Sequence, residues 1–280
     1  MVFQGASMSK VVLITGASSG IGSETAMFLA QRGYTVYAGT RNPLKLKDVH
    51  HKNLHILPLD IKDQENITDA VKQITDKHNR IDVLINNAGY GLVSTVEDVT
   101  EEEMFEQFNI NVFGVLRVCK SVIPVMRENQ AGIIINISSF LGKIGLPLLT
   151  FYNASKYAVE GVTDSLRYEL RDFNIRVHSI MPGFFSTNFA KDNLVVNKNI
   201  SDKNSPYASL ISNLAPTIIE QINSGNAASE AAELILKTVE DENAPARTTV
   251  GDKASKFIPM RRELSDEDFE RRVRDYYNLD

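Results

Sequence analysis

Tyr152 and Lys156, in the segment YNASK, form the pair of residues best suited to acid–base chemistry. Four positions apart on a helix, their side chains share one face about one turn apart. A free phenol titrates near 10, and a neighbouring ammonium favours the phenolate and lowers that pKa. Tyr152 can then act as general acid in a reduction and as general base in the reverse oxidation. The structural alternative is a core tyrosine beside a solvated lysine.

A second stretch, VVLITGASSGIG at 11–22, admits two kinds of chemistry. Its GASSG matches G-x-S-x-G, the turn that exposes a nucleophilic serine in α/β-hydrolases, which makes Ser18 a candidate nucleophile. The same residues match a glycine-rich phosphate cradle. In that case Gly16 permits the sharp turn, Gly20 lets the backbone approach a pyrophosphate, and Gly22 lets the helix pack closely on the sheet.

The sequence lacks the partners that a hydrolase needs. In that fold the triad runs Ser, Asp or Glu, then His, and earlier strands supply the oxyanion hole. His178, the last of five histidines, lies inside a predicted strand, and only one strand precedes GASSG. The cradle is favoured, because the free N–H groups and dipole of a helix N-terminus bind anions. A glycine-rich turn without a ligand is the remaining alternative.

These residues require a scaffold that alternates strands with helices. Short β-branched runs predict strands, and longer periodic segments predict helices. The strands are expected at 10–15, 34–40, 53–60, 80–89, 132–139, 174–183 and near 246–251; the helices are expected at 21–33, 63–78, 100–128, 153–173, 228–241 and 265–277. Nearly all-apolar strands are typical of a parallel sheet covered on both faces. The predicted fold is α/β, a Rossmann-like doubly wound sheet of about seven strands.

The strand–helix alternation stops after the sixth strand, which divides the chain into unequal parts. Residues 8–250 are expected to form a single domain. Within it, 184–226 is too long for an ordinary connection and is expected to be a substrate loop or lid. Residues 251–280 are expected to be a C-terminal tail with a short surface helix. Residues 1–7 lack periodicity and precede a second Met, so they are interpreted as an expression scar.

Composition limits the partners. The formal net charge is −5 and basic residues are spread along the chain, so no nucleic-acid surface is expected. No apolar run approaches the roughly 20 residues of a membrane span, and no metal site is expected. The single cysteine, Cys119, excludes an internal disulfide, favours a reducing, cytoplasmic setting, and is expected to be a buried packing residue.

Four motifs together resemble the short-chain dehydrogenase/reductase family, in its compact rather than its extended branch. They are TGASSGIG at 15–22, NNAG at 86–89, the serine of NISS with YNASK at 152–156, and PGFFST at 182–187. The resemblance covers nearly all of residues 10–250 and is nearest to retinol and hydroxysteroid dehydrogenases and their bacterial relatives. It implies an oxidoreductase that interconverts a carbonyl and an alcohol by hydride transfer with NAD(P).

The resemblance implies four catalytic residues. Tyr152 and Lys156 form the acid–base pair, and Ser139 orients the substrate oxygen. Ser138 competes for that role, but only one of two adjacent strand residues can face the site, and the family spacing favours Ser139. Asn111, in NVFG, resembles the family asparagine that holds a water linking Lys156 to solvent.

The cofactor prediction depends on the end of the second expected strand. NAD sites carry an acidic residue about 20 positions after the glycine loop, whereas NADP sites tend to carry arginine. Arg41 stands there and can meet a 2′-phosphate bidentately, which predicts NADP(H). NAD(H) remains the alternative, because Ser19 stands where the family's other basic residue would be. The implied cofactor-binding residues are Gly16, Ser18, Ser19, Gly20, Ile21, Gly22, Arg41, Asp60, Ile61, Asn87, Ala88, Gly89, Tyr152, Lys156, Pro182, Gly183 and Thr187.

Apolar residues flank the implied catalytic group and predict an apolar carbonyl or alcohol, such as a retinoid, a steroid or a fatty aldehyde. The implied substrate-contacting residues are Ser139, Tyr152, Phe140, Phe184, Phe185 and Phe189. Packing in the core or at a subunit interface is the alternative for the aromatic ones, since apolar loops also exclude water from active sites.

The family resemblance also implies a homodimer or homotetramer formed through two long helices. Ala154, Ala158 and Gly161 are small enough to allow close helix packing, although they can equally face the sheet. The rival function on the same fold is a non-catalytic dinucleotide-binding regulator, and the remote rival is a hydrolase using Ser18.

Overall fold

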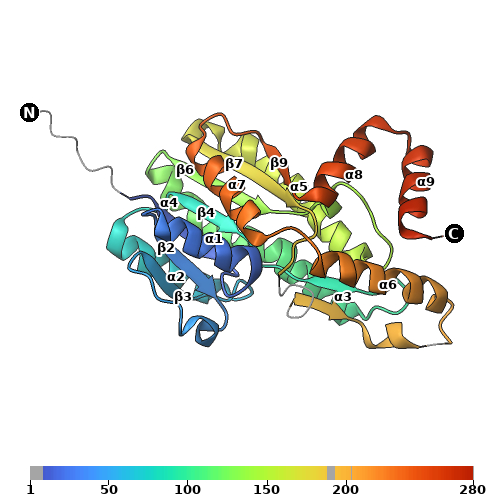
Figure 1. Cartoon of the computed structure of the whole chain (residues 1–280). Helices are drawn as coiled ribbons and strands as arrows, with labels where there is room; N and C mark the ends of the chain where they lie inside the picture. Colours follow the sequence, from blue (N-terminus) through green and yellow to red (C-terminus); the bar gives the residue numbers. More distant parts are fainter. Residues whose placement is uncertain (1–8, 188–192, 203, 280) are drawn as a thin grey trace, which may run out of the picture.

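The computed structural model describes residues 9–187, 193–202 and 204–279. Its main sheet has seven parallel strands in the order β3-β2-β1-β4-β6-β7-β9. The strands are β1 Val11–Thr15, β2 Thr35–Thr40, β3 Leu54–Pro58, β4 Val83–Asn86, β6 Gly132–Ile137, β7 Ile175–Pro182 and β9 Arg247–Val250. The strand order reverses between β1 and β4, which creates the crevice where such sheets bind ligands. The prediction of a Rossmann-like sheet of about seven strands is confirmed (Figure 1).

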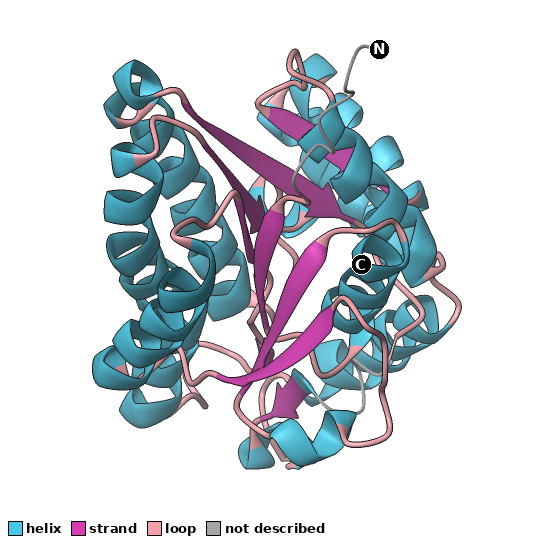
Figure 2. Ribbon diagram, turned by 90° about the vertical axis from the view of Figure 1, so that its left-hand side faces the viewer, coloured by secondary structure: helices cyan, strands magenta, loops and turns pink. Residues whose placement is uncertain are grey.

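Helices cover both faces of this sheet (Figure 2). The face-covering helices are α1 Gly20–Gln31 and α7 Ala228–Glu240 on one face, and α2 Gln64–His78, α4 Val115–Glu128 and α5 Thr150–Glu169 on the other. The alternation of β1 shows how the chain serves both layers. Val11 and Leu13 pack with the second group of helices, whereas Val12 and Ile14 pack with the first.

The segment expected as one helix over 100–128 is a helix with an irregular centre. Thr100 and Glu103 form a capping box that starts α3 (Glu101–Phe108), and α4 ends the segment. Between them η2, Asn109–Gly114, is a π-helical turn, a feature that frequently marks functional sites. By length and composition Glu101–Glu128 can cross a membrane, contrary to expectation. However, its buried residues, including Val118 and Val122, pack in the core on the face of the sheet that α2 and α5 also cover.

The structure contains several elements that the sequence did not predict. A second, two-stranded parallel sheet joins β5 (Gly91–Val93) to β8 (Leu194–Val196). The helix α6 (Ala208–Asn223) lies within the expected lid, with Pro216 inside it. Short 3-10 turns occur as η1 Pro43–Leu46, η3 Phe140–Gly142, η4 Arg171–Phe173 and η6 Lys198–Ser201. The second sheet, α6, η1 and η3 contribute residues to the border of the crevice, where regular alternation of strands and helices gives no guide.

The C-terminal region is more extensively packed than a tail with a single surface helix. It forms two helices, α8 (Asp252–Glu263) and α9 (Asp266–Tyr277), which lie near the C-terminus marked in Figure 1. Phe257 of α8 and Tyr277 of α9 are buried against Phe140 and its neighbours. The apolar side chains of these helices therefore extend the core behind the crevice. Residues 1–7, interpreted as an expression scar, lie outside the described residues.

Candidate active site

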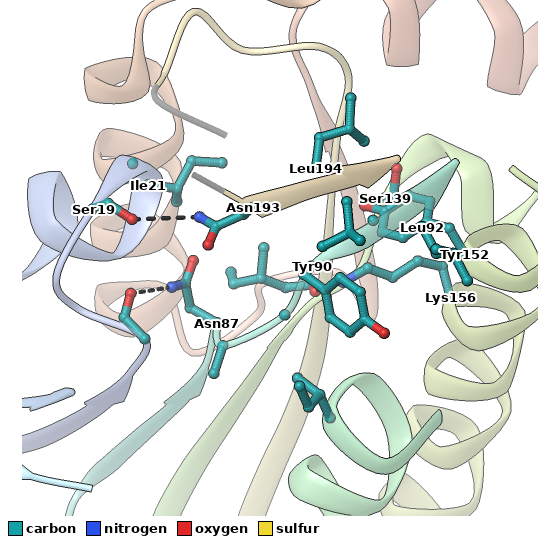
Figure 3. A pocket seen from close by; sticks show the side chains of 18 of the residues that line it. Ser19, Ile21, Asn87, Tyr90, Leu92, Ser139, Tyr152, Lys156, Asn193 and Leu194 are labelled. Atoms are coloured by element: carbon teal, nitrogen blue, oxygen red, sulfur yellow. Dashed lines mark hydrogen bonds between the residues drawn. The ribbon is translucent and has the colours of Figure 1, made fainter. Parts of the chain in front are cut away.

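A cavity of about 1300 Å³ lies at the carboxyl ends of the strands, at the reversal of strand order. Ser19 and Ile21 line one end, whereas Ser139, Tyr152 and Lys156 line the other (Figure 3). The predicted residues that line the cavity are Gly16, Ser18, Ser19, Gly20, Ile21, Arg41, Asp60, Ile61, Asn87, Ala88, Gly89, Ser139, Tyr152, Lys156, Pro182, Gly183, Phe184, Phe185 and Thr187. One space thus joins the predicted cradle to the predicted acid–base pair.

The glycine loop adopts the geometry that the cradle interpretation requires. Gly16 has φ +65°, and a Cβ there would lie 2.7 Å from the Cα of Ala88. Gly20 has φ +59° and opens α1, with Thr187 facing it. A Cβ on Gly22 would lie 2.3 Å from the amide nitrogen of Asn87. Side chains at Gly16 or Gly22 would therefore displace the loop from a helix N-terminus suited to an anion.

Hydrogen bonds from the end of β4 hold the loop in place. The Asn87 side-chain amide donates to the carbonyls of Thr15 and Gly16, each at 3.0 Å. The backbone N–H groups of Asn87 and Ala88 donate to the Thr15 hydroxyl. The Asn87 side chain thus fixes the cradle, and its predicted contact with an adenosine remains a prediction.

The other predicted cofactor residues lie farther along the same crevice, at the ends of β2 and β3. Arg41 is exposed and borders the cavity together with Lys45, which sequence reasoning missed. Asp60 is half-buried, and its carboxylate accepts from the backbone N–H of Lys62 at 3.0 Å. Ile61 is buried against Gly114, where a Cβ would lie 2.5 Å from the Ile61 side chain. The Arg41 guanidinium and the Asp60 carboxylate thus both border the part of the cavity at the ends of β2 and β3.

Ser139, Tyr152 and Lys156 come together from two elements. Ser139 follows β6 and caps η3 by accepting from the N–H of Leu141, and its hydroxyl bonds Tyr152. The Lys156 ammonium lies 5.6 Å from the centre of the Tyr152 ring and donates to the Ile137 carbonyl at 2.9 Å. Burial excludes the simple alternative of a solvated lysine, because Lys156 is only 6% exposed.

The electrostatics of the pair differ from the expectation. Burial raises the pKa of Tyr152 to about 12, although the hydrogen bond from Ser139 acts in the opposite direction. Burial lowers the pKa of Lys156 to about 8, opposed by the negative charge of Glu160. The predicted lowering of the tyrosine pKa by the lysine is wrong for this state. Burial is the largest influence on the phenol, and the Lys156 ammonium donates to the Ile137 carbonyl rather than to the Tyr152 hydroxyl.

Asn111 stands in the π-helical turn and lies outside the cavity lining. Its side chain donates to the Tyr90 carbonyl at 2.9 Å and to the Ser155 hydroxyl at 3.1 Å, and accepts from the Tyr90 N–H at 3.0 Å. Asn111 therefore joins the segment after β4 to the helix that carries Tyr152 and Lys156. The predicted link to a water stays a prediction, because the observed hydrogen bonds of this side chain go to Tyr90 and Ser155.

Three further candidates remain, Ser138, Phe140 and Phe189. Ser138, the competing serine, also borders the cavity, but its buried hydroxyl has no partner among the described residues, whereas the Ser139 hydroxyl bonds Tyr152. Phe140 is fully buried and packs edge-on against Phe184, so it supports the cavity wall without reaching the cavity. Phe189 lies outside the described residues.

The hydrolase alternative finds no support at Ser18. Among the described residues that border the cavity, none is a histidine. His178 is buried in β7, where its ring bonds the Pro245 carbonyl at 2.9 Å. Ser18 is therefore part of the glycine loop without the base that a serine nucleophile requires.

The family model of the short chain dehydrogenases matches residues 10–195. The chain belongs to the short-chain dehydrogenase/reductase family. It is 40% identical over 245 residues to the 3-ketodihydrosphingosine reductase of Bacteroides thetaiotaomicron, covering 86% of this chain and 88% of that protein.

Solved structures agree with the family assignment. A short-chain dehydrogenase from Streptomyces avermitilis is 31% identical, with a TM-score of 0.83 and coverage of 98% of this chain and 97% of that one. A short-chain dehydrogenase from Burkholderia cenocepacia, solved in complex with NADP, is 25% identical with a TM-score of 0.75, covering 95% and 97%. The family is that of oxidoreductases whose Rossmann-like fold binds NAD(P), and this chain shares its crevice.

This short-chain dehydrogenase has further cavity residues that the sequence did not indicate. The Asn193 amide donates to the Ser19 hydroxyl at 3.4 Å, which connects the segment before β8 to the glycine loop (Figure 3). Leu194 borders the cavity from β8, and Ile218 and Ile222 border it from α6. Their apolar character was visible, but nothing local placed their segments beside the catalytic end.

Proposed function

We propose that this chain is an NADP(H)-dependent oxidoreductase that interconverts a ketone or aldehyde and the corresponding alcohol on an apolar substrate. The observation that carries the proposal is the joining of the glycine cradle and the Ser139–Tyr152–Lys156 group in one cavity. A dinucleotide-binding regulator would have no use for a buried acid–base pair at the far end of its ligand crevice.

The residues present fit a dinucleotide. A cradle that a Cβ would fill, at Gly16 and Gly22, leaves the backbone bare at the N-terminus of α1, as a pyrophosphate requires. Arg41 supports NADP(H) over NAD(H), because a guanidinium pairs with a phosphate and no acidic side chain holds that position. The NADP named for the Burkholderia cenocepacia structure supports the same choice. When bound, the cofactor supplies or accepts the hydride.

The chain's own residues supply the proton and the orientation. Ser139 and Tyr152 share a hydrogen bond, so a substrate carbonyl between their hydroxyls would be oriented by both. Tyr152 donates its proton to that oxygen in reduction and accepts it in oxidation. Lys156 keeps a positive charge beside the phenol and stabilises the phenolate left after proton transfer. Asn111 holds Tyr90 and the helix of the pair in a fixed relation.

The far wall of the cavity supports an apolar substrate. Leu194, Ile218 and Ile222 line it together with Phe184 and Phe185. The name of the 40% identical relative adds a specific ketone class, a long-chain 3-ketone of the sphingoid type. We therefore propose ketones carrying a long alkyl chain as the substrate class, ahead of retinoids and steroids.

The first experiment titrates the protein with NADPH and with NADH, followed by nicotinamide fluorescence and thermal shift. Ligand at 100 times its dissociation constant stabilises a fold by about 2.7 kcal/mol. Tight NADPH and weak NADH are expected; equal affinities would contradict the role of Arg41.

Turnover is then compared among 3-ketodihydrosphingosine, methyl 3-oxododecanoate and hydroxyacetone. The two apolar ketones are expected to react faster, and a preference for hydroxyacetone would contradict the apolar site.

We also keep the homodimer or homotetramer, and the cytoplasmic location, as proposals. Ala154 and Gly161 are exposed on α5, and a Cβ on Gly161 would meet nothing within 4 Å. Phe113 and Leu116 are exposed on the neighbouring π-turn and α4. A small-residue stripe beside exposed apolar side chains supports close helix packing between copies. Light scattering tests this proposal, since a monomer would give 31.2 kDa.

A further inference from the structure

Glu160 is a buried carboxylate that the proposed reaction does not use. It follows Lys156 by four positions on α5, and is only 2% exposed. One carboxylate oxygen accepts from the Ser179 hydroxyl of β7, and the other accepts from Arg247 Nε of β9 at 2.5 Å. Burying a carboxylate costs several kcal/mol even after relaxation, so the fold retains this group against a substantial penalty.

Glu160 belongs to a group of ion-paired charges one helical turn beyond Lys156 on α5, close enough for its charge to act on the ammonium without a direct ion pair. Arg247 also pairs with Asp164 of α5 at 2.6 Å, and Lys143, after η3, reaches Glu160 at 3.5 Å. With Lys156 the group holds three cations and two carboxylates, a formal charge of +1. Without Glu160, three cations would face one carboxylate, a formal charge of +2.

We propose that Glu160 is a positioning residue for the reaction, whose carboxylate, anchored by Ser179 and Arg247, keeps the Lys156 ammonium charged inside the protein. The inference rests on the proposed reductase function, because that reaction needs a cation beside the Tyr152 phenolate. The Tyr152 ring also faces Lys156, with its centre 5.6 Å from the ammonium.

Burial and charge act in opposite directions on Lys156. Burial lowers its pKa to about 8, and the negative charge of Glu160 raises it. Removing that charge allows burial and the remaining cations to lower the pKa further, so Lys156 would lose its proton nearer to neutral pH. Removing Arg247 instead lowers the formal charge of the group from +1 to 0, which favours the charged form of Lys156 and raises the pKa of Lys156.

The test compares Glu160→Gln with Arg247→Gln in the pH profile of kcat/KM for methyl 3-oxododecanoate reduction. Activity falls as pH rises through the Lys156 pKa, so the midpoint should move down in Glu160→Gln and up in Arg247→Gln. If the midpoint moves from about 8 to about 7, the protonated fraction at pH 8 falls about fivefold. The double variant restores a formal charge of +1 and should return the midpoint toward that of the wild type.

A merely structural ion pair gives a different pattern. Both single variants would then unfold at lower temperature and lose kcat, with the midpoint unchanged, and this result would overturn the proposal. Asp164→Asn, at a half-exposed position of the same group, provides a milder variant if Glu160→Gln does not fold. Its midpoint should move down by less.

A second readout does not depend on turnover. Protein labelled with ¹³C at lysine Cε is titrated by NMR without cofactor, and the Lys156 signal is assigned with Lys156→Arg. The same opposite shifts of midpoint are expected in Glu160→Gln and Arg247→Gln. Shifts without any ketone reduction would refute the proposed function and leave the charge coupling intact; unmoved midpoints would refute the coupling itself.

Discussion

The two ends of the cavity are built differently. The cofactor end is mainly backbone: a glycine loop between β1 and α1, held by the amide of Asn87 from β4. The catalytic and substrate end is mainly side chains, with Ser139 from η3's cap, Tyr152 from α5 and Leu194 from β8. One end depends on where a Cβ is missing, whereas the other depends on which side chains meet.

This difference separates two kinds of sensitivity. At a backbone site an added side chain is harmful, because a Cβ on Gly16 would collide with the backbone of Ala88. At a side-chain site, each group has its own chemistry, so substitutions range from severe to slight. The following variants test whether the two ends fail independently.

The largest effect is expected from Tyr152→Phe. The phenyl ring keeps the shape but removes the proton that the hydroxyl transfers, and such groups contribute about 10²- to 10⁴-fold. Loss of kcat of that order is therefore expected in ketone reduction with NADPH. NADPH affinity, measured by nicotinamide fluorescence, should stay near the wild-type value. Full turnover in this variant would remove Tyr152 from the mechanism.

Gly16→Ala should damage the opposite end. A Cβ at φ +65° is strained, and it would lie 2.7 Å from the Ala88 backbone, so the loop must move. Loss of two charge-assisted hydrogen bonds to a pyrophosphate, each worth about 1.5–3 kcal/mol, would weaken NADPH binding by about 100-fold or more.

Gly33→Ala is the matched control for Gly16→Ala. Gly33 also has positive φ, at +88°, but an added Cβ there meets nothing within 4 Å. Both variants should lose about 1–2 kcal/mol of stability to backbone strain, measured by chemical unfolding. Only Gly16→Ala should lose NADPH affinity; equal loss in both would show that general destabilisation, rather than the cradle, controls binding.

The backbone end could be predicted largely from sequence. Glycines at positive φ, such as Gly16 and Gly20, are visible as residue types, and a single local turn contains them. The all-apolar strands likewise predicted a sheet covered on both faces, since alternate residues of β1 serve alternate layers. The glycine loop and the fold class were both predictable because each depends on the conformation of short stretches of chain.

The side-chain end could be predicted only in part. The spacing of Tyr152 and Lys156 was readable, but their pKa shifts depend on burial by distant elements. The strand β8 has three residues and forms only by pairing with β5, so its own sequence carries little signal. Likewise, the burial of Phe140 depends on Phe257 of α8, which no local pattern brought near it.

Arg41→Gln should sharpen the description of the cofactor end, where a side chain supplements the backbone. A guanidinium bound to a phosphate contributes about 1.5–3 kcal/mol, which corresponds to about 10- to 100-fold in NADPH affinity. NADH affinity should change little, because that cofactor lacks the 2′-phosphate. Lys47→Gln, at an exposed position just after η1, is the control and should alter neither. Equal weakening of both cofactors by Arg41→Gln would refute phosphate recognition.

The smallest effect is expected from Leu194→Ala at the substrate end. Leu194 borders the cavity and is half-buried, so truncation removes part of the apolar surface available to an alkyl chain without leaving a large core cavity. A loss of about 1 kcal/mol, a little more than the transfer energy of one buried methylene, raises KM for methyl 3-oxododecanoate about fivefold. KM for hydroxyacetone should not rise. Val196→Ala, two positions along the same strand but outside the cavity lining, should leave both constants unchanged. If Val196→Ala raises KM as much as Leu194→Ala does, the apolar wall acts through the stability of β8 rather than through contact with the substrate.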